Sequence, residues 1–172
     1  MGAEEKAKVL GIEFPDNAEK AYLNMVARIG NTLYTSGHVS DIKGKLGAGL
    51  SVEDGYAAAK ECGIEILQSV HQEVGSLDGL RVVKLLGMVN SSLDFTEQHL
   101  VINGISDLYH EIFGKDGDGF HARSAVGFAQ LPTGVAVEIE AMSVVHQAIE
   151  DGVEGRIVAD FAGHAAEARD VP

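Results

Sequence analysis

The stretch from His121 to Ala141, HARSAVGFAQLPTGVAVEIEA, decides the fold and carries the most informative chemistry. It contains two predicted strands, 122–131 and 135–146, separated by the turn sequence Pro132-Thr133-Gly134. Such a break between two apolar runs predicts a β-hairpin. An arginine begins the first strand among small residues, and the second strand carries two carboxylates. An arginine and a carboxylate beside tightly packed β-structure suit a small anionic ligand and an activated water.

The second of these strands has two faces of different character. One face carries Val135, Val137, Ile139, Ala141 and Val145. The other carries Ala136, Glu138, Glu140, Met142 and Val144. Because successive residues of a strand point to opposite sides of a sheet, the first face suits packed helices. The second face is too apolar for solvent alone and suits another subunit, so we expect a homo-oligomer.

The sequence before this stretch supplies the rest of the sheet and a long helix. Residues 22–37 predict two strands that meet at the turn pair Gly30-Asn31. Ser51 begins the capping-box pattern SVED, and apolar residues at helical spacing continue the helix to about residue 74. Leu80–Val89 is apolar enough to be a central strand.

Two further helices complete the predicted order of elements. One extends from Thr96, as its N-cap, to just before Gly114, and a short one covers residues 3–11. The main order is therefore β-β-α-β-α-β-β. This order predicts an α+β fold, in which a mixed β-sheet has two helices packed on one face.

Length and composition predict a single domain over residues 1–172. We expect a core over about 20–146, an N-terminal helical extension over 1–19, and an acidic C-terminal tail over 147–172. The net charge of −13 repels phosphate backbones, which argues against nucleic acid as a partner.

Cellular location is predicted from the absence of targeting signals. No apolar run approaches the ~20 residues of a membrane span, and the N-terminus has no signal-peptide h-region. The single cysteine, Cys62, excludes an intramolecular disulfide. We therefore expect a cytoplasmic protein without a membrane partner.

Arg123 is the candidate anchor for an anion, because a planar guanidinium binds a carboxylate through two parallel hydrogen bonds. The competing interpretation is a structural ion pair with a neighbouring acid. Glu138 and Glu140 lie on one strand face, and one of them is the candidate general base that orients a water; the competing interpretation is an exposed or interface-lining acidic edge. In the predicted hairpin Glu138 lies opposite Phe128, roughly 16 Å from Arg123 at about 3.3 Å per residue. The two side chains could then meet at one ligand only across a subunit interface.

We predict neither a metal nor an organic cofactor. The seven histidines have no HExxH motif and no paired spacing: His38, His71, His99, His110, His121, His146 and His164. Cys62 lies inside the helix over 51–74, which favours a core residue over a nucleophile. The glycines do not take the spacing of a P-loop, a dinucleotide fingerprint or GxSxG.

These residues resemble the reactive-intermediate deaminase family of RidA/YjgF type, also labelled endoribonuclease L-PSP or chorismate-mutase-like. The resemblance runs from about Tyr22 to Val145. Its most specific parts are Gly30-Asn31 leading into LYTSGHV, and ARSAVGFAQLPTGVAVEIEA. The segments GYAAAKECGIEIL and VINGISDLYHEIFG are similar to a subgroup with a longer N-terminus.

The resemblance implies a homotrimer with three clefts between subunits, where imines formed from enamines are hydrolysed to a 2-keto acid and ammonia. It implies that Arg123 binds the carboxylate of the substrate and that Glu138 positions the attacking water. It further implies that Ser36, Gly37 and Tyr22 line the cleft.

The chain departs from the family pattern at Ala125, where a cysteine is common. The family fold is also used without proven activity. The alternative function is therefore a non-catalytic protein that binds a small carboxylate-bearing metabolite in the same cleft.

Overall fold

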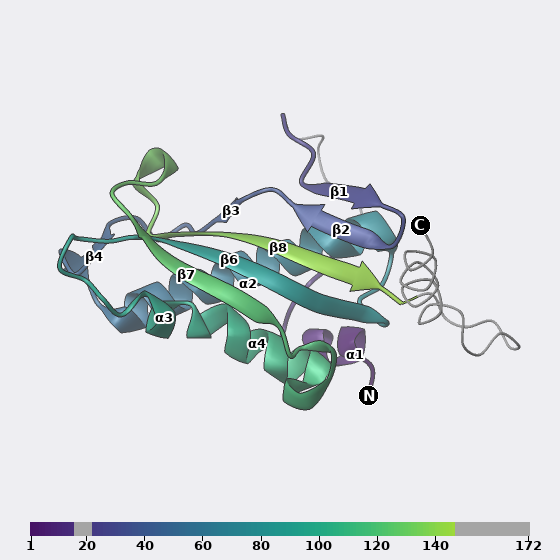
Figure 1. Ribbon diagram of the computed structural model, residues 1–172. Coiled ribbons are helices and arrows are strands. Elements are labelled where there is room, and N and C mark those ends of the chain that lie inside the picture. Colours follow the sequence, from purple (N-terminus) through teal and green to yellow (C-terminus); the bar gives the residue numbers. More distant parts are fainter. Residues whose placement is uncertain (16–21, 147–172) are drawn as a thin grey trace, which may run out of the picture.

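The computed structural model describes residues 1–15 and 22–146, and its long helices lie on one side of a mixed β-sheet (Figure 1). The strands of this sheet are β1 (Val26–Ile29), β2 (Thr32–Thr35), β3 (His38–Val39), β6 (Leu80–Asn90), β7 (Ala122–Phe128) and β8 (Val137–Val145). The helices are α1 (Ala3–Val9), α2 (Val52–Val74), α3 (Gln98–Val101) and α4 (Asn103–Phe113). A separate small ribbon pairs β4 (Lys45–Leu46) with β5 (Gly49–Leu50). The predicted α+β class and the order of its main elements are confirmed, whereas the predicted tail 147–172 lies outside the described residues.

β6 is an internal strand, as its apolar sequence predicts. The strand order is β1-β2-β8-β6-β7, and β3 pairs with β8 beyond the end of β2. β8 is antiparallel to β2 and β6, whereas β7 is parallel to β6. Leu85 and Val89 of β6 are fully buried beneath the helices. β7 therefore forms one edge of the sheet, and Arg123 lies on that edge.

The predicted hairpin of the last two strands is wrong, because β6 lies between β7 and β8. The connecting segment crosses the end of β6, where Leu131 and Val135 pack on Met88. Lys45 holds this crossing by donating a hydrogen bond to the Ala129 carbonyl at 2.5 Å. A turn sequence shows where the chain changes direction but not which strand it then pairs with. An apolar strand such as β6 is more stable with partners on both edges.

The long helix α2 begins at the predicted residue. Ser51 Oγ accepts a hydrogen bond from the Asp54 amide, and the Asp54 carboxylate accepts one from the Ser51 amide at 2.9 Å. This reciprocal pair is the predicted capping box. The helix ends where Gly75 adopts a left-handed conformation with φ of 82°. Among the described residues, no helix is long and apolar enough to cross a membrane.

The second predicted helix is divided into α3 and α4, and Thr96 is not its N-cap. Glu97 takes the N-cap position of α3, one residue later than predicted. Ile102 separates the two helices, and it is fully buried against the sheet. A Cβ on Gly87 of β6 would lie 2.5 Å from Ile102 Cδ1, so this helix junction packs directly on the strand. Burial of Ile102 explains why the helical path is interrupted there.

Close backbone contact joins α4 to α2. A Cβ on Gly104 would overlap the carbonyl oxygen of Tyr56 on α2. Only glycine allows this approach. Gly104 therefore fixes the position of α4, the helix that carries most of the contacts to Arg123.

The sheet has a buried face and an open face, as the alternation along β8 predicts. Val137 and Ile139 belong to the core beneath the helices, while Glu138 between them points the other way. We call the side away from the helices the open face. Tyr34 and Phe128 lie on it and are 47% and 40% exposed.

Candidate functional site

Glu138 lies on the open face, and its carboxylate contacts the backbone of Gly37. β3 pairs with β8 at this point, with Val39 opposite Glu138. A Cβ on Gly37 would overlap Oε1 of Glu138 and would lie 2.9 Å from its Cδ. Gly37 has no positive φ, so a side chain is excluded here by lack of space. The structure thus brings together three predicted site residues: Ser36, Gly37 and Glu138.

The connection between β2 and β3 is held firmly beneath this carboxylate. Ser36 Oγ donates a hydrogen bond to the Asn24 carbonyl at 2.8 Å. The ring of His38 is buried, with Nδ1 2.9 Å from the Ser36 carbonyl oxygen and Nε2 2.8 Å from Ser69 Oγ. A carbonyl oxygen only accepts, so Nδ1 carries the proton. Burial lowers the pKa of His38, and the bond to the Ser36 carbonyl partly opposes this, so a neutral ring anchors the segment.

The environment of Glu138 makes it a stronger base than an ordinary glutamate. Burial raises the pKa of its carboxyl group, and the nearby negative charge of Glu140 raises the pKa further. Glu138 is half-buried, whereas Glu140 is exposed. The interpretation of an exposed acidic edge therefore fits Glu140, whereas an acidic edge that lines a subunit interface stays a prediction for both residues.

Arg123 points from β7 toward the helices and is held there by neutral acceptors. Its Nη1 donates to Ser106 Oγ at 2.9 Å, and its Nη2 donates to Asn103 Oδ1 at 2.8 Å and to the His99 carbonyl at 3.2 Å. In the described part of the chain, no carboxylate forms an ion pair with Arg123. These bonds use three of the five guanidinium donors and fix the side chain in place. The positive charge and the two remaining donors stay available to an anionic ligand.

Arg123 and Glu138 do not meet within one chain. Arg123 is level with Leu85 and Ala141, three residues along β8 from Glu138 and two strands away. At about 3.3 Å per residue and 4.8 Å per strand, their Cα atoms are roughly 14 Å apart. The side chains also point to opposite faces of the sheet. Tyr22 is 100% exposed, and the structure brings it to neither residue.

A pocket of about 300 Å³ lies beside Arg123. It is lined by Asn103, Ser106, Asp107, His110, Lys115, Phe120, His121 and Arg123. Of its basic residues, sequence reasoning identified only Arg123. His121 had a usable signal, because it precedes Arg123 by two residues and so shares its side of the strand. Lys115 and His110 had none, because α4 and the turn after it reach β7 only in the folded chain.

A chain of hydrogen bonds orients Arg123 within this pocket. The Gly119 carbonyl lies 2.5 Å from His121 Nδ1, so that nitrogen carries the proton. Ser106 Oγ lies 3.0 Å from His121 Nε2 and donates to it, while Arg123 donates to Ser106 Oγ. Because Nε2 accepts while Nδ1 carries the proton, these hydrogen bonds require a neutral His121. Burial lowers the pKa of His121, and the nearby His110 and Arg123 lower it further, against the opposing effect of Gly119.

Other candidate chemistry has a structural explanation. Cys62 is fully buried, and burial raises the pKa of its thiol, which fits the predicted core residue. Within residues 1–15 and 22–146, no group of three or more His, Cys, Asp and Glu side chains could hold a metal ion.

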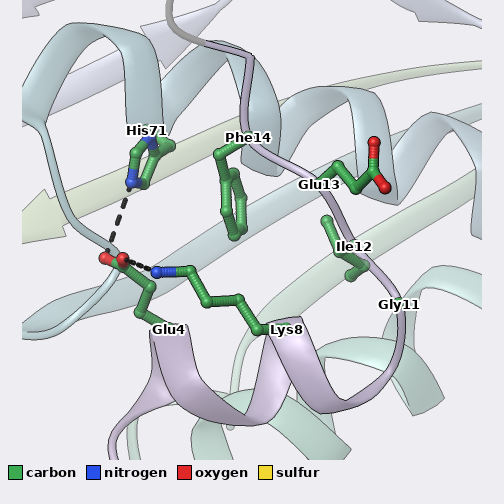
Figure 2. A pocket seen from close by; sticks show the side chains of 7 residues that line it. All are labelled: Glu4, Lys8, Gly11, Ile12, Glu13, Phe14 and His71. Carbon is green, nitrogen blue, oxygen red and sulfur yellow. Dashed lines mark hydrogen bonds and ion pairs between the residues drawn. The ribbon is translucent and has the colours of Figure 1, made fainter.

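A second pocket, of about 470 Å³, lies between the N-terminal segment and α2 (Figure 2). Glu4 is 2.7 Å from Lys8 Nζ and 3.5 Å from His71 Nε2, and Phe14 stacks on the His71 ring. Hydrogen bonds from Lys8 and Ser76 lower the pKa of Glu4 to about 2. Glu4 is thus the acceptor for both neighbouring basic side chains, and none of the predicted site residues lines this pocket. Its contacts attach the N-terminal segment to α2.

The chain matches a known protein family over most of its length. Residues 15–145 match the family model described as Endoribonuclease L-PSP. Protein TCP17 of Trypanosoma cruzi is 45% identical over 142 residues, which cover 77% of this chain and 88% of that protein.

Solved structures agree with this match. The protein Atu1372 of Agrobacterium tumefaciens, whose function is unknown, has a TM-score of 0.76 and 37% identity, over 84% of this chain and 94% of its own. RidA from an Antarctic Psychrobacter has a TM-score of 0.51 and 23% identity, over 76% of this chain and 96% of its own. The second likeness concerns the fold alone.

Proposed function

The chain belongs to the endoribonuclease L-PSP family, and on this premise we propose that it is a hydrolytic deaminase of 2-imino and enamino acids. The products are a 2-keto acid and ammonia, and neither a metal nor an organic cofactor takes part. The observation that carries the proposal is the half-buried Glu138 carboxylate against the Gly37 backbone, where burial raises its pKa. The family name refers to an endoribonuclease, but a net charge of −13 disfavours an RNA substrate.

The proposed reaction needs a base and an anchor. Glu138 accepts a proton from a water molecule while the water oxygen forms a bond to the imine carbon. That proton then passes to the imine nitrogen, which gives a carbinolamine. Glu138 next takes the hydroxyl proton and passes it to the amino group, so that the C–N bond breaks, ammonia leaves and the carbonyl group forms. Arg123 binds the carboxylate of the substrate throughout. Such imines already hydrolyse in water, so positioning and modest base catalysis are sufficient.

We propose that the site is shared between subunits of a homotrimer, with Arg123 from one subunit and Glu138 from the next. Support comes from their separation of roughly 14 Å within one chain and from their opposite faces. The open face gives further support, because it exposes Tyr34 and Phe128 together with part of Val126. Contact with other subunits would remove this apolar surface from water.

The test is release of ammonia from imino acids that an amino-acid oxidase generates in the same solution. We expect the wild-type protein to accelerate release, and Arg123→Met to abolish the acceleration. Arg28→Met is the matched control, because Arg28 is an exposed cation on β1 that bonds only to the Gly30 carbonyl among the described contacts. This control should keep the wild-type rate.

The same assay separates the deaminase from the alternative binding protein. No acceleration with small, aliphatic or aromatic imino acids would contradict the deaminase. Binding of a 2-keto acid that survives Glu138→Gln, without turnover in the wild type, would instead identify a binder of carboxylate metabolites.

A further inference from the structure

The pocket beside Arg123 gathers basic side chains in a strongly acidic protein. Lys115, His110 and His121 line it together with Arg123, and Asp107 is the one carboxylate residue in its lining. Asp107 accepts a hydrogen bond from Tyr56 at 3.1 Å. Across residues 1–15 and 22–146, the ion pairs include none to Lys115, His110 or Arg123. Arg123 and Lys115 are cations that gather here without an ion pair to a carboxylate among the described residues, and in a chain of net charge −13 this indicates a site for anions.

The basic groups come from two positions around this pocket. Arg123 and His121 lie at the start of β7 and are joined through Ser106. His110 lies in the last turn of α4, and Lys115 lies in the turn that follows. The ring centroids of His110 and His121 are 5.4 Å apart. Because His110 and Lys115 line the same pocket as Arg123, the pocket offers a second basic position beyond the Arg123 guanidinium.

The remaining wall suits the carbon chain of such a molecule. Phe120 lines the same pocket and is 66% exposed, although a large apolar side chain is more stable when covered. A volume of about 300 Å³ lies at the small end of ligand-binding pockets. These features fit a short ligand with an anionic group at each end.

We propose that the ligand of this pocket carries a second anionic group. Arg123 binds the carboxylate next to the reacting carbon, and Lys115 with His110 binds an acidic side chain. This inference rests on the proposed function and narrows its substrates to 2-imino dicarboxylates, with 2-keto dicarboxylates as products. A ligand of the same length with an uncharged far end would leave Lys115 and His110 without a partner.

The test compares two five-carbon 2-keto acids, 2-oxoglutarate and 2-oxopentanoate, which differ in the group at the far end. Isothermal titration calorimetry on the full-length protein measures both affinities. We expect 2-oxoglutarate to bind at least about tenfold more tightly, as a charge-assisted contact provides. Lys115→Met should remove most of that preference. Lys60→Met, an exposed lysine on α2 outside the pocket, should keep the preference.

Each result decides the inference. Equal affinities, no binding of either acid, or a preference that survives Lys115→Met would overturn it. Turnover of the corresponding imino acids is measured separately. A dicarboxylate preference in binding, with no turnover of either imino acid, would refute the deaminase and leave the ligand class standing. Turnover of the imino acids without a dicarboxylate preference in binding would refute the ligand class and leave the deaminase standing.

Discussion

Two inactive variants of this protein should restore activity when their subunits are mixed. Arg123→Met removes the anchor for the substrate carboxylate and leaves the base, whereas Glu138→Gln removes the base and leaves the anchor. Their Cα atoms are roughly 14 Å apart in one chain and their side chains point to opposite faces, so neither variant holds a complete site. A cleft between subunits can still receive one intact residue from each variant.

The expected size of the recovery follows from the geometry of the proposed trimer. In trimers assembled at random from equal amounts of the two variants, a cleft is complete when its Arg123 comes from a Glu138→Gln subunit and its Glu138 comes from an Arg123→Met subunit. Roughly a quarter of the clefts meet this condition. We therefore expect about a quarter of the wild-type rate from the mixture. Glu138→Gln alone should fall by roughly 10²- to 10⁴-fold, the usual effect of losing a general base, and Arg123→Met alone should lose the acceleration.

The assay measures ammonia release after the two variants are unfolded together in urea and refolded. As a control, each variant is unfolded and refolded alone, which shows whether the urea treatment by itself raises its activity. Light scattering should give three times the chain mass of 18.2 kDa in every sample. A mixture that forms this trimer and stays as inactive as its parents would refute the shared site. A monomeric mass would refute the trimer.

Four further predictions concern glycines and the two glutamates of β8. Gly37→Ala should reduce turnover about as much as Glu138→Gln, roughly 10²- to 10⁴-fold, because its Cβ overlaps Oε1 of Glu138 and displaces the carboxylate. Glu140→Gln should shift the acid limb of the pH–rate profile to lower pH, because Glu138 must be ionised and loses the charge that helps to raise its pKa. In urea unfolding, Glu138→Gln should raise the free energy of unfolding at neutral pH, because an ionised group whose pKa is raised in the folded state destabilises the fold. Below pH 4.5 the carboxyl group is protonated in both states, so the variant should have no such effect. Gly104→Ala should lower the free energy of unfolding by roughly 1–3 kcal/mol or more, because its Cβ overlaps the Tyr56 carbonyl.

Lys60→Ala is the control for both glycine variants, because the Lys60 side chain is exposed on α2 and alanine suits a helix. It should keep both activity and stability. A fully active Gly37→Ala would contradict the contact with Glu138, and an unchanged pH profile in Glu140→Gln would show that Glu140 does not act on the base. Wild-type stability of Gly104→Ala would contradict the close approach of α2 and α4.

The parts of the fold that depend on local sequence were predictable. The capping box of Ser51 and Asp54 is written in four consecutive residues, and the structure starts α2 there. The partner of β7 was not predictable in this way. Its pairing with β6 joins residues about 38 positions apart, such as Leu85 and Arg123, and depends on which arrangement covers β6 on both edges.

The candidate site likewise contains residues that the sequence identifies and residues that only the folded chain brings together. Residue type and family resemblance identified Arg123 and Glu138, and the structure adds the reason for Gly37, namely the space taken by the Glu138 carboxylate. Lys115 and His110 were missed, because no sequence spacing connects them with Arg123. Only the packing of α4 against the edge strand brings them into one pocket.

The position of β8 between β2 and β6 has a consequence for synthesis of the chain. It is the last strand of the described residues, and it pairs on both of its edges. A chain made from its N-terminus therefore holds two half-sheets, each with an unpaired inner edge, until Val137–Val145 has been added. Such edges pair readily with other chains. We therefore expect a chain that stops before Val137 to keep both inner edges unpaired and to aggregate more readily than the full-length chain.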